Sequence, residues 1–173
     1  MDKRLPNKIK SKLVRLAYYQ IMGGIIGFIM VIWLVAQTVT ITGLVILLFL
    51  FAGGLYFFSI YCGRLLLKGD YYLGLKLSTI NQSLQIFSFA FLGFAFKFVA
   101  GLYIGIGIDY TRNLDFKFAF SLSDIQVSIN QDEELITFGL NFVSVFLIQY
   151  IVRIKNDIEE NNLLQIPKID AEY

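Results

Sequence analysis

The sequence contains no histidine, one cysteine and two prolines among 173 residues, and only 16% of its residues are charged. Without histidine, the chain lacks the commonest metal ligand and the commonest general base. The lone Cys62 cannot form an internal disulfide bond. We therefore expect no catalytic residues, no metal site and no cofactor, and we predict that the protein is not an enzyme.

Apolar residues take the place of the missing charges. They make up 57% of the chain, which has 17 phenylalanines and 10 tyrosines. A water-soluble domain has roughly one quarter charged residues, so this composition indicates that the protein folds in lipid. The net charge of +2 is too small to indicate a nucleic-acid partner, and membrane lipids are the expected surroundings.

The charge-free stretches predict four membrane helices. No charged residue occurs from residue 16 to residue 63, which is long enough for two helices of about 20 residues joined by a tight turn. In a second stretch, residues 77–108, Lys97 is the only charged residue, and a third stretch, residues 135–152, has none. The expected fold is an all-α membrane protein with four transmembrane helices, at about 17–36, 41–61, 86–107 and 135–152.

The remaining segments predict the orientation of this four-helix transmembrane domain, residues 17–152. A basic lead-in, residues 1–16, carries six Lys or Arg, while three lie between the second and third helices and three lie in the tail, residues 153–173. The loop 109–134 has two Lys or Arg and six Asp or Glu. Because cytoplasmic segments are enriched in Lys and Arg, we expect both termini in the cytoplasm and a multi-pass protein of the plasma (inner) membrane.

The external loop 109–134 shows the alternation of a small β-hairpin between helices three and four. A turn at Ser123 and Asp124 would pair Leu122 with Ile125 and Phe120 with Val127 on one face. Such a face needs a cover, either the lipid interface and the protein's own helix ends or a partner that docks on the face or the strand edge. The predicted face consists of Phe116, Phe118, Phe120, Leu122, Ile125, Val127 and Ile129.

Lys97 falls near the middle of the predicted third helix, where a charge costs about 2.5 to 3.5 kcal/mol. The predicted helices contain no Asp or Glu. If the helix begins earlier, Lys97 snorkels to the interface; otherwise it pairs with another subunit or a lipid phosphate, or takes part in transport. The polar neighbours available within the chain are Tyr56, Asn141, Ser144 and Gln149.

Two small-residue motifs predict close helix packing. Gly23 and Gly27 form a GxxxG motif in the first helix, and Gly101 and Gly105 form another in the third. We expect them to pack within the bundle, although contact with another molecule is an alternative. The alternation of glycine and apolar residues from 101 to 108 also fits a strand, but we favour a helix.

These features favour a non-enzymatic accessory or structural subunit of a larger membrane assembly. The external hairpin and the helix faces would contact a membrane protein partner. The alternative is a small channel, transporter or lipid-handling protein with a polar path past Lys97. A lipid-modifying enzyme is the third choice, with Asp70 beside two tyrosines as its interfacial acid. No nucleotide, hydrolase or metalloprotease motif is present.

Overall fold

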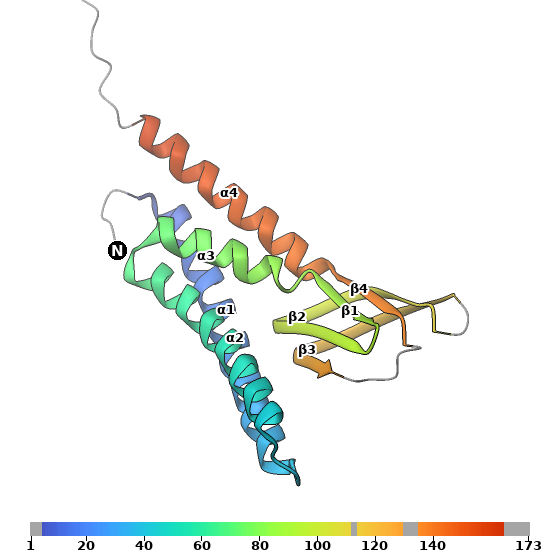
Figure 1. Ribbon diagram of the computed structural model, residues 1–173. Helices are drawn as coiled ribbons and strands as arrows, with labels where there is room; N and C mark the ends of the chain where they lie inside the picture. Colours follow the sequence, from blue (N-terminus) through green and yellow to red (C-terminus); the bar gives the residue numbers. More distant parts are fainter. Residues whose placement is uncertain (1–4, 112–113, 130–134, 165–173) are drawn as a thin grey trace, which may run out of the picture.

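The structure, a computed structural model, describes residues 5–111, 114–129 and 135–164, and it combines helices with a sheet (Figure 1). The helices are α1 (Asn7–Gln37), α2 (Gly43–Lys68), α3 (Tyr71–Ser83) and α4 (Phe142–Leu164). The strands are β1 (Phe87–Phe91), β2 (Phe94–Asp109), β3 (Asp115–Ile129) and β4 (Thr137–Asn141). The all-α prediction is therefore wrong. Parts of the predicted lead-in, external loop and tail lie outside the described residues, at 1–4, 112–113, 130–134 and 165–173.

Helices α1 and α2 form a long antiparallel hairpin, which extends downwards in Figure 1. The predicted membrane helices 17–36 and 41–61 lie within them, and both helices are long and apolar enough to cross a membrane. Only 28% of the most apolar stretch of α1 and 17% of that of α2 are buried inside the protein. A core helix of a soluble domain would be mostly buried, so the hairpin retains the character of a membrane element.

The predictions of the other two membrane helices are wrong. The segment 86–107 forms β1 and most of β2, and the segment 135–152 forms β4 and the first half of α4. Within the described part of the chain, α1 and α2 are the two candidate membrane helices. These predictions relied on the low charge content of the two segments. A strand with one apolar face and glycine or alanine on the other can be as poor in charge as a membrane helix, and only the period of the sequence distinguishes the two.

Helices α3 and α4 pack against the charged end of the hairpin, and we call this region the helical cap. The Lys12 ammonium and the Asp157 carboxylate lie 2.5 Å apart and link α1 to α4. Towards the sheet, the Gln20 amide donates a hydrogen bond to Ser78, and the Asn81 amide donates to Ser59 and Gln20. The apolar core of the cap includes Leu13, Leu16, Leu66, Leu75, Ile151 and Ile154.

The four-stranded sheet is antiparallel, and its longest strand is bent. One edge of β2 pairs with β3 over its whole length. Two strands share the other edge of β2. The start of β2 pairs with β1, the end of β2 pairs with β4, and β1 and β4 also pair with each other. All these pairings can coexist only if β2 curves. The register shift between Val99 and Leu102 provides the bend, and Gly101 at φ 121° adopts a backbone conformation that disfavours other residues.

Candidate functional site

The sheet has two unlike faces, and the register defines them. One row across the four strands is Phe87, Leu140, Ile106 and Phe118, and the next is Phe89, Phe138, Ile108 and Phe116. Residues directly opposite each other point to the same side of a sheet, so these rows form one apolar surface, which we call the phenylalanine face. On the opposite side, the polar face, Ser88, Gly139, Gly107 and Lys117 form a row.

The phenylalanine face is exposed along β3, and the residues that β3 contributes to it are those of the predicted hairpin face. Phe116, Phe118, Phe120 and Leu122 have exposed fractions of 61%, 84%, 72% and 53%. Val127 lies opposite Phe96, which lies opposite Phe89, so Val127 belongs to the same face. Ile125 packs on the α1–α2 helical hairpin, and Ile129 is the last residue of β3 and lies opposite Phe94. These residues share one face, although the predicted pairing between them is wrong.

Ser123 lies inside β3, opposite the two bulged residues Ala100 and Gly101 of β2, and is not part of a turn. Its φ is 40°, and it lies opposite the register shift in β2. The two alternation phases predicted as paired strands therefore belong to one strand, whose partner is β2. A bulge changes the phase of a strand in the same way as a turn. Sequence periodicity alone therefore does not distinguish the two.

This bulge is also the point where the sheet is fixed to the hairpin. The Ser123 hydroxyl donates to the Gly23 carbonyl, 2.9 Å away, and accepts from the Gly101 N–H at 3.0 Å. The Tyr19 hydroxyl accepts from the Leu102 N–H at 3.0 Å. A Cβ atom on Gly23 would lie 2.5 Å from the Ala100 carbonyl carbon, so only glycine permits this approach.

The predicted glycine motifs have different outcomes. Gly23 and Gly27 do bring elements together, because Gly23 contacts β2 and Gly27 lies under the Tyr56 ring of α2. Gly101 and Gly105, in contrast, lie in β2, so their prediction as a helix-packing motif is wrong. Gly101 forms the bend, and Gly105 allows the Leu140 carbonyl of β4 to approach.

Lys97 lies in β2 and has a partner within the chain. Its ammonium is 2.5 Å from the Asp124 carboxylate and 4.6 Å from the centre of the Tyr103 ring. The prediction of a lysine at mid-helix with no acidic partner in the chain is therefore wrong. Asp124 was missed because the predicted turn placed it in an external loop, far from Lys97. Lys97 lies opposite Gln126, two residues from Asp124 along β3, so the antiparallel register of β2 and β3 brings the two side chains together.

The polar residues predicted to surround Lys97 have other positions. Tyr56 packs edge-on against Phe98, with ring centres 5.4 Å apart. Asn141 ends β4 and caps the start of α4, since its side chain accepts from the Val143 N–H and donates to the Ser144 hydroxyl at 2.8 Å. Gln149 is exposed on α4. The structure therefore does not form the predicted polar path past Lys97.

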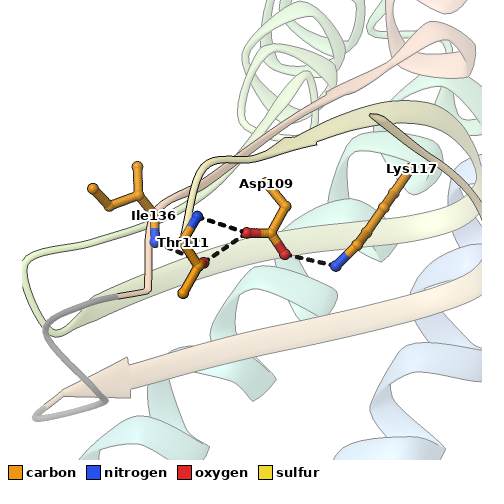
Figure 2. A network of polar contacts seen from close by, with 4 residues as sticks. All are labelled: Asp109, Thr111, Lys117 and Ile136. Atoms are coloured by element: carbon orange, nitrogen blue, oxygen red, sulfur yellow. Dashed lines mark hydrogen bonds and ion pairs between the residues drawn. The ribbon is translucent and has the colours of Figure 1, made fainter. Parts of the chain in front are cut away.

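A second ion pair lies near the far end of the β2–β3 ribbon (Figure 2). The Lys117 ammonium donates to the Asp109 carboxylate at 2.6 Å, and Thr111 donates to the same carboxylate through its N–H and its hydroxyl. The Thr111 hydroxyl also accepts from the Ile136 N–H, which connects β4. These hydrogen bonds, that of Lys117 first, hold the pKa of Asp109 well below its usual value, and Asp109 raises the pKa of Lys117.

The polar face encloses a hollow of about 350 Å³, lined in part by Lys97, Tyr103, Gly107, Lys117 and Gly139. Both lysines in this lining are neutralised by their carboxylate partners. In the described residues, no group of three metal-ligating side chains comes together. Both ion pairs join β2 to β3 across the polar face.

Comparisons with known proteins give no identification. No protein-family model matches the chain, and no curated protein and no solved structure is significantly similar to it. The functional conclusion therefore depends on the hairpin and the sheet.

Proposed function

We propose that the protein is a non-enzymatic accessory subunit of a membrane protein assembly, anchored by the α1–α2 hairpin. The observation that carries the proposal is the combination of an apolar, largely unburied hairpin with a sheet that has an open edge. Strand β3 is 15 residues long, and its described pairing is with β2 alone. A long open strand edge is a template for a strand of another protein.

The hairpin defines the orientation in this proposal. Two membrane helices return the chain to its starting side, so α3, α4 and the sheet all lie on the side of the amino terminus. Lys8, Lys10, Lys12 and Arg15 flank the start of the hydrophobic part of α1, and Arg64 and Lys68 flank the end of that of α2. The excess of Lys and Arg on this side supports the proposal that it faces the cytoplasm.

Cysteine labelling of intact cells tests the orientation. In a Cys62→Ser background, we expect Lys10→Cys and Tyr110→Cys to resist a membrane-impermeant maleimide. Thr40→Cys, at the tip of the hairpin, should be labelled from outside. Tyr110 lies just beyond β2 and is 63% exposed, so it reports the side on which the sheet lies. Labelling of Tyr110→Cys but not of Lys10→Cys from outside would refute the hairpin topology.

Native mass spectrometry of the full chain, extracted in mild detergent, tests the accessory role. We expect a stoichiometric complex with one discrete membrane protein, and backbone amides of β3 should exchange hydrogen more slowly in it than in the isolated chain. The amides of α3 serve as the internal control and should exchange equally in both. A homogeneous bare monomer, with unchanged exchange in β3 when extracted under native conditions, would refute the proposal.

A further inference from the structure

We propose that the phenylalanine face lies in the lipid interface beside the hairpin, so that the sheet is a second membrane-contacting element. This inference rests on the membrane insertion of the hairpin, which is part of the proposed function. It does not depend on the partner at the β3 edge, because a strand edge and a sheet face are different surfaces.

The distribution of side chains over the sheet is inverted relative to a soluble protein. The most exposed residues of the phenylalanine face are Phe118 and Phe120, at 84% and 72%. The charged residues Lys97, Asp109 and Lys117 line the hollow of the polar face and are paired with opposite charges; Lys97 and Asp109 are 21% and 17% exposed and Lys117 is 58% exposed. A sheet in water would bury its aromatic side and expose its charges. The observed order fits a surrounding medium that is apolar on one side.

The phenylalanine face continues directly into the hairpin. Phe98 of β2 packs against Tyr56 of α2, and Ile125 of β3 packs against the same cluster, which includes Val31 of α1. Beyond this contact, the hairpin exposes Ile29, Trp33 and Leu50 at 59%, 56% and 71%. Lipid that covers these side chains therefore meets the edge of the phenylalanine face. This continuity identifies lipid as the occupant.

The depth of the contact fits the interface between headgroups and acyl chains. The sheet is fixed to α1 at Gly23, eight residues beyond Arg15, which corresponds to about 12 Å along a helix. Interfacial elements bury an apolar face by about 5–10 Å. At this level, water and headgroups can satisfy the open edge of β3, whereas open sheet edges do not occur in the hydrocarbon core.

The single tryptophan of the chain, Trp33, provides an internal reference for the test. Full-length protein is reconstituted in phosphatidylcholine vesicles with bromine atoms on the acyl chains, which quench tryptophan fluorescence at short range. The wild type reports the hairpin through Trp33. In a Trp33→Phe background, Phe118→Trp reports the phenylalanine face, and Tyr72→Trp is the matched control, because Tyr72 is an aromatic residue of the helical cap with 86% exposure.

We expect the Phe118→Trp variant to be quenched within about twofold of the wild type, with blue-shifted emission, and the Tyr72→Trp variant to be unquenched. A Phe118→Trp variant that is as unquenched as Tyr72→Trp would overturn the inference. Blue-shifted but unquenched emission would also overturn it, because a protein partner or a second copy would then cover the face. If Trp33 itself is unquenched, the hairpin anchor of the proposed function fails and this inference fails with it, whereas a quenched Trp33 with an unquenched Phe118→Trp variant overturns the inference alone.

Discussion

The α1–α2 hairpin and the β2–β3 ribbon are both apolar, poor in charge and rich in exposed aromatic or aliphatic residues, yet one is helical and the other is a bent pair of strands. In α2, apolar side chains surround the whole helix, as expected where lipid is on most sides. In β2, isoleucine alternates with glycine from Ile104 to Ile108. Composition therefore indicates the medium, and the period indicates the secondary structure.

The contact between these two regions depends on their close approach at Gly23. We expect Gly23→Val to cause the largest loss of stability, about 3 kcal/mol, because the added carbons meet the β2 backbone at Ala100, which cannot move aside as a flexible side chain can. Unfolding by denaturant in detergent micelles measures the change.

The matched control for that variant is Gly54→Ala in α2, where an added Cβ meets no atom within 4 Å. This substitution should leave stability unchanged or raise it by up to about 1 kcal/mol through helix propensity. Equal destabilisation by the two variants would mean that the hairpin and the sheet are not in contact at Gly23.

The Lys97–Asp124 ion pair tests a second difference between the two regions. The ribbon contains this ion pair, whereas the charge-free segments of the hairpin contain none. Lys97→Met should cost about 2 kcal/mol, since Asp124 would be left half-buried without its cation. The double variant Lys97→Met with Asp124→Leu should recover most of this loss. A double-mutant cycle of unfolding free energies measures the coupling, and purely additive losses would contradict the pairing.

A smaller effect is expected at the bulge. Ser123→Ala removes the hydrogen bond to the Gly23 carbonyl and the acceptor for the Gly101 N–H, which together should cost about 1 to 2 kcal/mol. Ser128→Ala, further along β3, is the control and should change stability by less than about 0.5 kcal/mol. Hydrogen exchange of the β2 amides around residue 101 should increase in the first variant and not in the second.

The smallest effect concerns pH. Because the pKa of Asp109 is lower in the folded protein than in the unfolded chain, its ion pair stabilises the ribbon above the unfolded pKa. This contribution is lost as the pH falls from that value towards the lower folded pKa. The protection of amides near Thr111 against hydrogen exchange, relative to their intrinsic exchange rates, should therefore fall in acid in the wild type, and Asp109→Asn should remove this dependence. An unchanged acid profile in the variant would show that another group titrates there.

Part of the fold could be predicted from the sequence. The charge-free residues 16–63 contain the hairpin, since its length and polar tip leave little alternative. The residues of the phenylalanine face in β3 were also grouped correctly, because a period of two survives in any strand arrangement. The partners of these strands were not predictable, since a bulge and a turn produce the same change of phase.

What the sequence by itself determined is the apolar composition, the helical hairpin and the existence of an alternating aromatic surface, because each is encoded in local composition or local period. Only the tertiary structure decided that residues 86–109 are strands, that Lys97 meets Asp124, and that Gly23 meets Ser123. The two contacts join residues that are 27 and 100 positions apart along the chain, and the pairing of the strands and the packing of the sheet on the hairpin bring them together.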